Sequence, residues 1–243
     1  MSSRPLASDS DATVCFRDRE EAGEQLAAAV ALAIATHPGA GSPSSATPQP
    51  PFIVYALPRG GLPVAVPVAQ RLQCPLDVVM AKKITRVDNP ELAIGAVSAE
   101  GETIWLTAGR SPLPMLGHSE ARHVQAWEHA HTKAQHQLAE FRQRWPGRSP
   151  TGAIAIVVDD GIATGMTIAA AVQTLRAQAP AQIWICAPVA PPDLLPQLQS
   201  WGDRVILLAT PSPFNSVSRF YQTFPQVEMS EALECLQKAN ALP

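Results

Sequence analysis

The most constraining feature of the sequence is a fully apolar run that ends in two adjacent carboxylates. Residues 153–158 read Ala-Ile-Ala-Ile-Val-Val, and Asp159 and Asp160 follow at once. A short, uninterrupted apolar run is typical of a strand buried on both faces of a parallel sheet. Such a strand would deliver both carboxylates to the carboxyl edge of the sheet, where open α/β sheets bind ligands.

The loop after the two acids has the composition of an anion-binding site. Gly161 and Gly165 allow backbone conformations closed to other residues, and a helix is expected to begin at Thr167. Free amides at the helix start, together with the hydroxyls of Thr164 and Thr167, would bind a phosphate. The acids would repel that phosphate unless they accept hydrogen bonds from hydroxyls one sugar away, as in a sugar phosphate with a vicinal diol. The alternative is that the acids only cap a loop and Thr167 only caps a helix.

Strands and helices alternate along the rest of the chain. Apolar strands are expected at residues 52–57, 76–81, 153–158, 183–189 and 205–209. Helices are expected at 15–36, 62–72, 119–144, 167–177, 193–199 and 230–239, and a hairpin joins 92–98 to 103–106 with Gly101 at its turn. This order predicts an α/β fold: a central, mostly parallel five-stranded sheet with helices on both faces, a β-hairpin and a small hood.

Proline usage is high and marks a loop within the expected domain. It supplies 24 of the 243 residues, about twice ordinary usage, and five of the 24 lie in residues 37–51. We expect residues 1–13 to be a disordered tail and residues 14–243 to form a single domain. Within that domain, 37–51 is a Pro-rich surface loop and about 210–243 a C-terminal hood.

Charge and cysteine usage exclude several classes of protein. The net charge of −3 gives no broad basic surface for nucleic acid. Cys15, Cys74, Cys186 and Cys235 are scattered with no CxxC pair, so a zinc site is not expected. The longest apolar run, of about ten residues, is too short for a membrane span, and no signal peptide precedes it. We therefore expect a cytoplasmic protein without a membrane partner.

Together these segments resemble the type I phosphoribosyltransferases. Residues 157–167 are similar to the family signature for 5-phosphoribosyl 1-diphosphate. The resemblance runs from Phe52 onward and includes residues 57–61 (Leu-Pro-Arg-Gly-Gly), Lys82-Lys83 and residues 89–97. It implies the family fold and a glycosyltransferase (pentosyltransferase) activity that requires Mg²⁺ and no protein nucleophile.

The resemblance assigns roles to individual residues. It implies that Asp159 and Asp160 bind the ribose hydroxyls and contact the metal indirectly. It implies that the 5-phosphate is bound by Gly161, Ile162, Ala163, Thr164, Gly165, Met166 and Thr167. It implies that pyrophosphate is bound, often through a cis peptide, by Pro58, Arg59, Gly60 and Gly61. The residues implied as catalytic are Arg59, Lys83, Asp159 and Asp160.

Some of these roles have alternatives. Arg59 suits the neutralisation of a diphosphate, although it could instead be a solvated surface charge. One of Lys82 and Lys83 would reach the diphosphate, and the other would be solvated or ion-paired. Residues 84–91 would form a flap that closes over the site and excludes water.

The acceptor is not defined by the sequence. Enzymes for 6-oxopurines carry an acid where this chain has Ala163, which argues against hypoxanthine and guanine. Phe214 and Tyr221, in the hood, would either stack on a planar heterocycle or form the hood's own core. Five of the six histidines lie between His118 and His136, and we interpret them as part of a solvated polar helix rather than as metal ligands.

Three functions remain open at this point. The leading one is an enzyme that uses Mg-5-phosphoribosyl 1-diphosphate and a nucleobase-like acceptor, with pyrophosphate as the leaving group. The second is a non-catalytic sensor of phosphoribosyl diphosphate or of a nucleotide. The third is a nucleotide phosphorylase or hydrolase with the same ribose-phosphate pocket. The resemblance is also compatible with a homodimer.

Overall fold

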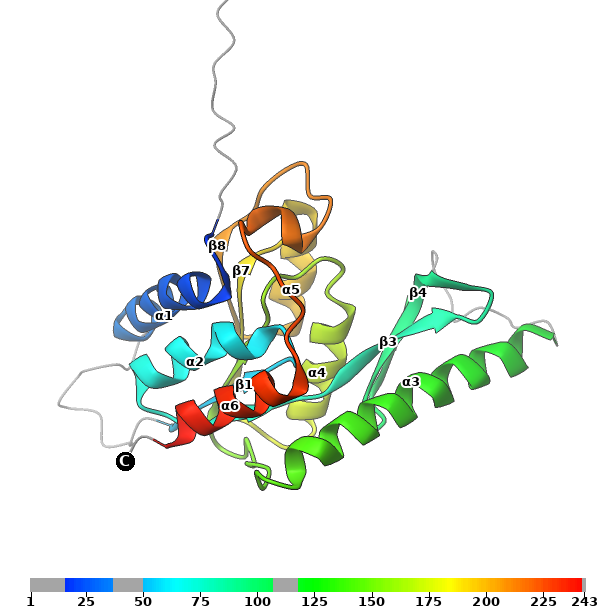
Figure 1. Ribbon diagram of the computed structural model, residues 1–243, viewed down its shortest axis with the longest axis horizontal. Helices are drawn as coiled ribbons and strands as arrows, with labels where there is room; N and C mark the ends of the chain where they lie inside the picture. The colour runs from blue at the N-terminus through cyan, green and yellow to red at the C-terminus, as the bar shows by residue number, and fades with distance from the viewer. Residues whose placement is uncertain (1–15, 37–49, 107–117, 242–243) are drawn as a thin grey trace, which may run out of the picture.

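A five-stranded parallel sheet forms the centre of the molecule (Figure 1). The computed structural model describes residues 16–36, 50–106 and 118–241. The strands in spatial order are β2 (Leu76–Val78), β1 (Phe52–Ala56), β6 (Ile154–Val158), β7 (Gln182–Val189) and β8 (Arg204–Ala209). All neighbouring pairs are parallel, which confirms the predicted fold class. The expected tail at 1–13 and most of the expected loop at 37–51 lie outside the described residues.

The second predicted strand is wrong in one respect, because residues 76–81 do not form a single strand. β2 ends at Val78, and after Val79 and Met80 a new strand, β3 (Ala81–Arg86), begins in a separate sheet. The backbone of Val79 still bonds to β1, through Ala56, whereas the carbonyl of Met80 accepts a hydrogen bond from Ala99. All six residues are buried, so the apolar pattern does not mark the point where the chain changes sheets.

The second sheet is antiparallel and contains the predicted hairpin. β3 pairs with β4 (Asn89–Ser98), and β4 pairs with β5 (Thr103–Trp105). Gly101 lies between β4 and β5 with a φ of 100°, a conformation that favours glycine. Residues 84–91, the expected flap, form the end of the β3–β4 hairpin, where Arg86 and Asp88 make an exposed ion pair.

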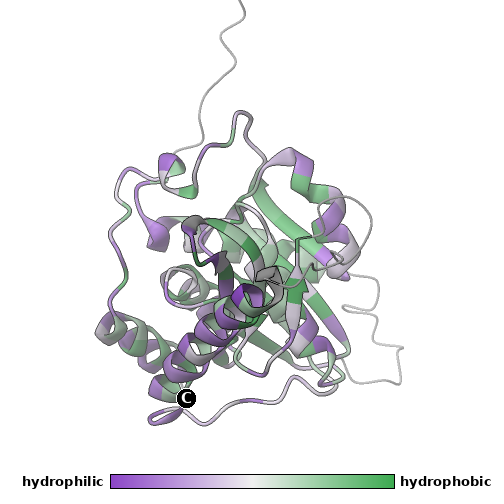
Figure 2. Ribbon diagram, turned by 90° about the vertical axis from the view of Figure 1, so that its right-hand side faces the viewer, coloured by the Kyte–Doolittle hydropathy of each residue, from purple (hydrophilic) through white to green (hydrophobic). Residues whose placement is uncertain are grey.

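Helices cover both faces of the parallel sheet, as predicted. On one face lie α1 (Arg19–Ala35), α2 (Gly61–Leu72) and α6 (Met229–Asn240), which share a core with alternate strand residues such as Val54 and Ile156. On the other face, α4 (Met166–Arg176) and α5 (Leu195–Trp201) pack on Tyr55 and Val157. A single 3-10 turn, η1 (Pro192–Leu194), precedes α5. Figure 2 shows hydrophobic strands in the middle and hydrophilic residues on the helices around them.

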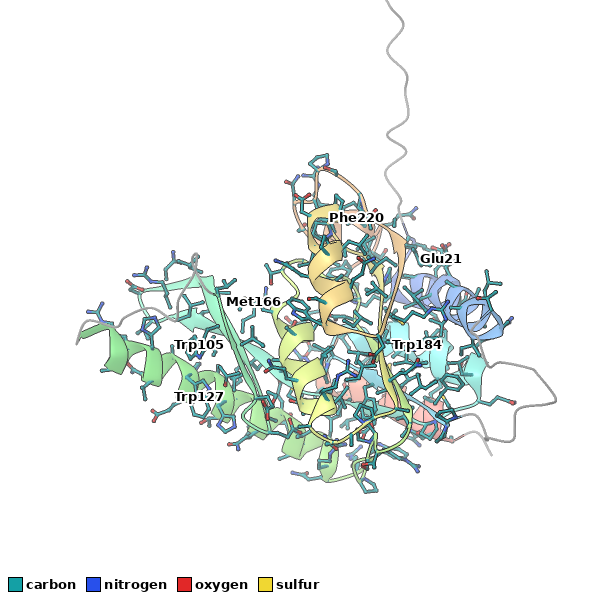
Figure 3. The ribbon with its side chains drawn as sticks, turned by 180° about the vertical axis from the view of Figure 1, so that it is seen from behind. Glu21, Trp105, Trp127, Met166, Trp184 and Phe220 are labelled. Atoms are coloured by element: carbon teal, nitrogen blue, oxygen red, sulfur yellow. The ribbon has the colours of Figure 1, made fainter. Side chains whose placement is uncertain are left out.

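The long helix α3 (His118–Arg142) joins the two sheets. It extends beside β3 and β4, away from the central sheet (Figure 1). Ala126 and Ala130 pack on the antiparallel sheet, whereas Phe141 is buried in the main core. Trp127 and Trp105 lie in the part of the molecule formed by α3 and the antiparallel sheet, and Trp184 lies within the central sheet (Figure 3). Trp127 donates a hydrogen bond to the Thr103 hydroxyl at 2.9 Å, so it anchors the helix to β5.

The chain between β8 and α6 forms a small aromatic cluster. It contains the 3-10 turn η2 (Val217–Phe220), and the cluster is built around Phe16, Phe220 and Tyr221. The helix α6, by contrast, packs on α2 and shares the main core. No helix within the described ranges is long and apolar enough to cross a membrane.

Candidate functional site

A cavity of about 280 Å³ opens at the carboxyl ends of β1 and β6. Its walls include the loop after β1, the two acids after β6, and Thr167 at the start of α4. Arg19 of α1 and the segment at Gln226 and Val227 complete it. The structure therefore brings the two predicted ligand loops together, and it adds residues from both ends of the chain.

The two acids are held close to one another and to the protein backbone. The backbone amide of Asp160 donates to Oδ1 of Asp159 at 2.9 Å, and the amide of Asp159 donates to the carbonyl of Cys186 at 3.3 Å. Burial, together with the neighbouring charge of Asp160, raises the pKa of Asp159 well above its usual range. Burial also raises the pKa of Asp160, although the adjacent guanidinium of Arg19 opposes this. Such perturbed carboxylates in a cavity are typical of functional sites.

The loop after β1 approaches these acids closely. The peptide between Pro58 and Arg59 is cis. A Cβ on Gly61 would lie 2.7 Å from the carbonyl oxygen of Val158, so a side chain there would collide with the backbone of β6. The Arg59 side chain is one-quarter exposed and lies 3.6 Å from the exposed carboxylate of Glu228. Because exposed pairs at this distance are weak, the Arg59 guanidinium remains free to bind an anion in the cavity.

Lys82 and Lys83 on β3 lie in different surroundings. Lys82 is half-buried; burial and the positive charges of Lys133 and Arg59 lower its pKa to about 8. Lys83 is exposed, and its charge acts on Asp159. It also lines a second cavity, of about 550 Å³, between β3 and α3. Neither lysine is among the described residues that line the 280 Å³ cavity, so their charges act on it only through Arg59 and Asp159.

The loop from Gly161 to Thr167 leads into the start of α4, which no side-chain hydrogen bond caps. Gly165 has a φ of 70° and precedes α4, which begins at Met166, one residue earlier than expected. Ala163 and Thr164 are exposed, and Thr167 lines the cavity. The side chains of Ile162 and Met166 are buried in the core, so only their backbone could face a ligand.

The two aromatic residues predicted to contact an acceptor belong to the cluster after β8. Phe214 packs on Phe220 with ring centroids 5.0 Å apart, and Tyr221 packs on Phe16 and Phe224. Neither of the two is among the described residues that line the 280 Å³ cavity. Tyr221 instead donates a hydrogen bond of 2.6 Å to the backbone carbonyl of Asp160. The aromatic cluster therefore helps to fix the backbone of the acid pair.

Sequence reasoning missed Arg19. Its Nε lies 2.8 Å from Oδ2 of Asp160, although the two residues are far apart in the chain. A signal for it existed, because the buried face of α1 consists of residues with helical spacing, namely Ala22, Gly23, Leu26, Ala27 and Val30. The same spacing extended back by one turn reaches Arg19. A buried arginine at a helix start indicates a partner or a ligand.

The residues of the site suit a magnesium ion that arrives with its substrate. No group of three or more His, Cys, Asp or Glu side chains in the described parts of the chain could hold a metal by itself. Mg²⁺ is commonly held by one or two carboxylates together with substrate phosphates and water. Asp159 and Asp160 provide that kind of oxygen donor beside a loop suited to a diphosphate.

Comparison with known proteins agrees with this architecture. A model of the phosphoribosyl transferase domain matches residues 42–209, so the chain belongs to the phosphoribosyltransferase family. Two curated proteins, from two strains of Mycobacterium tuberculosis and provisionally named phosphoribosyl transferases, are each 34% identical over 226 residues. That alignment covers 93% of this chain and 47% of each relative, so the chain spans about half their length.

A solved structure supports the same fold. The crystal structure of TT1426 from Thermus thermophilus matches with a TM-score of 0.70 and 29% identity. The match covers 91% of this chain and 97% of that one. Its extent shows that the similarity includes elements outside residues 42–209, such as α1 or α6.

Proposed function

We propose that the protein transfers a phosphoribosyl group from Mg-5-phosphoribosyl 1-diphosphate to a heterocyclic acceptor and releases pyrophosphate. The observation that carries this proposal is the arrangement of charge in one cavity. The acid pair Asp159 and Asp160 forms one wall, and the cation Arg59 forms another, with Lys82 close to it. A ligand with a neutral diol at one end and a diphosphate at the other matches that arrangement.

The residues of the chain divide the work of binding. The carboxylates of Asp159 and Asp160 accept hydrogen bonds from the ribose hydroxyls. Backbone amides before α4, with Thr164 and Thr167, bind the 5-phosphate. Gly60 and Gly61 let the loop after β1 pack against the acid loop, because side chains there would meet it. The backbone amides of this loop bind the diphosphate. These contacts hold the anomeric carbon in place between the acceptor and the leaving group.

The reaction itself exchanges one bond for another at the anomeric carbon. The bond from C1 to the diphosphate oxygen breaks with its electron pair going to that oxygen, and a bond from an acceptor nitrogen to C1 forms. The proton of the acceptor N–H passes to water or to the released pyrophosphate. The transition state is positive on the sugar and negative on the departing group, so Arg59 and a charged lysine of β3 stabilise it. Bound magnesium supplies further neutralisation of the diphosphate. The end of the β3–β4 hairpin, at residues 84–91, is the segment that would exclude water.

The identity of the acceptor is restricted at one position. Ala163 is exposed in the loop between the acid pair and α4, and it offers no carboxylate to a base. An acceptor that needs an acid at this place, as 6-oxopurines do in similar enzymes, is therefore not expected. Other planar nitrogen heterocycles remain candidates.

A sensor function is favoured by one specific observation. One group that would contact the ligand already has a buried partner in the protein, Asp160 with Arg19, and Arg59 lies in a weak pair with Glu228. A module that only binds phosphoribosyl diphosphate could exchange these partners for the ligand and change its surface. Both functions use the same cavity and differ in whether pyrophosphate is released.

A pyrophosphate-release screen separates the two functions. Wild-type protein is incubated with Mg-phosphoribosyl diphosphate and a panel of nucleobases and small heterocycles, and pyrophosphate is measured. The proposed activity predicts release with at least one acceptor and none without an acceptor, and the Asp159→Asn, Asp160→Asn double variant is the inactive control. Tight binding of phosphoribosyl diphosphate without release by any acceptor would contradict the enzyme and support the sensor.

A further inference from the structure

Arg19 is held in the cavity wall by three different contacts. Its Nε donates to Oδ2 of Asp160 at 2.8 Å, and its Nη1 donates to the carbonyl of Pro225 at 2.7 Å. The guanidinium carbon lies 3.6 Å from the ring centroid of Phe224. The arginine side chain is only 9% exposed. Since two edges and one face are fixed, the guanidinium has little freedom to move and is pre-organised for its partner.

This arrangement leaves the two oxygens of Asp160 with different roles. Oδ2 faces Arg19, whereas no hydrogen bond from another described residue reaches Oδ1. The backbone of Asp160 is fixed as well, because its carbonyl accepts the hydrogen bond from Tyr221. The side chain is 14% exposed and lines the cavity, so its carboxylate is accessible to a ligand there.

Resting on the proposed function, we propose that Arg19 is a positioning residue for ribose recognition. It holds Oδ2 of Asp160 and thereby directs Oδ1 toward a hydroxyl of the ribose. Arg19, Phe224 and Pro225 all lie outside residues 42–209, the part matched by the family model. The recognition of the diol would therefore depend on both ends of the chain, through α1 and the segment before α6.

The alternative role for Arg19 is to fasten α1 to the end of the sheet. That role would make the arginine important for stability without any effect on which sugar is bound. The preference for ribose over 2-deoxyribose separates the two roles. A carboxylate in the correct orientation gains a hydrogen bond from a ribose hydroxyl, and a carboxylate in another orientation does not. A hydrogen bond to a charged group supports a discrimination of about tenfold or more.

Calorimetry with two sugar phosphates provides the test. Ribose 5-phosphate and 2-deoxyribose 5-phosphate are titrated into wild-type protein and into Arg19→Met, with pyrophosphate as a third ligand. We expect the wild type to prefer ribose 5-phosphate about tenfold, and Arg19→Met to reduce this preference to about threefold or less while pyrophosphate affinity stays within about threefold. Arg17→Met is the matched control, because Arg17 is exposed and its side chain pairs only with its neighbour Asp18 among the described residues.

Further variants keep the test decisive if Arg19→Met does not fold. Phe224→Leu retains the arginine but removes the ring on which it lies, so it should reduce the preference by a smaller factor. Unchanged selectivity in both folded variants, or an equal loss for all three ligands, would overturn the positioning role alone. Failure of the wild type to bind ribose 5-phosphate would instead overturn the proposed function.

Discussion

Gly60 and Asp160 approach each other so closely that a Cβ on Gly60 would overlap Oδ2 of the aspartate. The first residue belongs to the loop after β1, and the second to the loop after β6. The two strands are hydrogen-bonded neighbours, which brings their loops to one edge of the sheet. The loop after β1 and the acid pair after β6 are therefore parts of a single packed unit.

Gly60→Ala should disrupt this unit. The added methyl group must displace the Asp160 carboxylate, so we expect phosphoribosyl diphosphate affinity to fall by about tenfold or more. Gly152→Ala is the control, because a Cβ there meets no atom within 4 Å although its φ of 69° makes the substitution strained. The control should lose stability and keep ligand affinity. Equal affinity in both variants would contradict the coupling of the two loops.

Arg59→Ala should affect one end of the ligand only. The guanidinium would bind the diphosphate through charge-assisted hydrogen bonds worth about 1.5–3 kcal/mol, so pyrophosphate affinity should fall by about 10–100-fold. The affinity for ribose 5-phosphate should stay within about threefold. Glu228→Gln, which removes the weak partner of Arg59, should leave pyrophosphate affinity equal or slightly higher. Equal losses for both ligands in Arg59→Ala would place this arginine at the wrong end of the site.

Lys82 should make the binding of an anion in the site depend on pH. Its pKa is lowered to about 8 by burial and by the charges of Lys133 and Arg59. A bound anion stabilises the charged form and raises that pKa, so binding takes up a proton above pH 8, and affinity falls as the pH rises. We expect pyrophosphate to bind the wild type less tightly at pH 9 than at pH 7, relative to Lys82→Met measured in parallel. Pyrophosphate itself titrates equally in both measurements, so the difference between the two proteins reports on Lys82. Identical pH profiles would show that Lys82 does not cause the pH dependence.

Most of the fold could be predicted because β1, β2, β6 and β7 are almost wholly buried, and β8, although only partly buried, is apolar after Arg204. Each therefore appears as a short apolar run, and the helices between them follow from spacing. The passage of the chain from the parallel sheet to the antiparallel sheet at Val79 and Met80 could not be predicted from the apolar runs. Both residues are apolar and buried, and the turn from one sheet to the other depends on backbone bonds to β1 and to Ala99.

The segments that line the cavity could be predicted where each is local in the chain, and the roles of their residues stay predictions. The acid pair and the two glycine loops each lie in one short segment, and the parallel topology brings those segments together. Arg19 was missed because its partner is 141 residues away, and the acidic residues around it suggested only a favourable helix start. The aromatic cluster was ambiguous because Phe214 and Tyr221 suit either a base or a core, and only their packing partners distinguish the two.

The central claim is that the acid pair binds the ribose of magnesium phosphoribosyl diphosphate. Calorimetry of that ligand with the wild type and with the Asp159→Asn, Asp160→Asn double variant tests it most directly. We expect measurable binding to the wild type and a loss of about 100-fold or more in the variant, because two charged acceptors become neutral amides that each present one oxygen and one NH2 donor. A correctly folded double variant with wild-type affinity would contradict the assignment of the site.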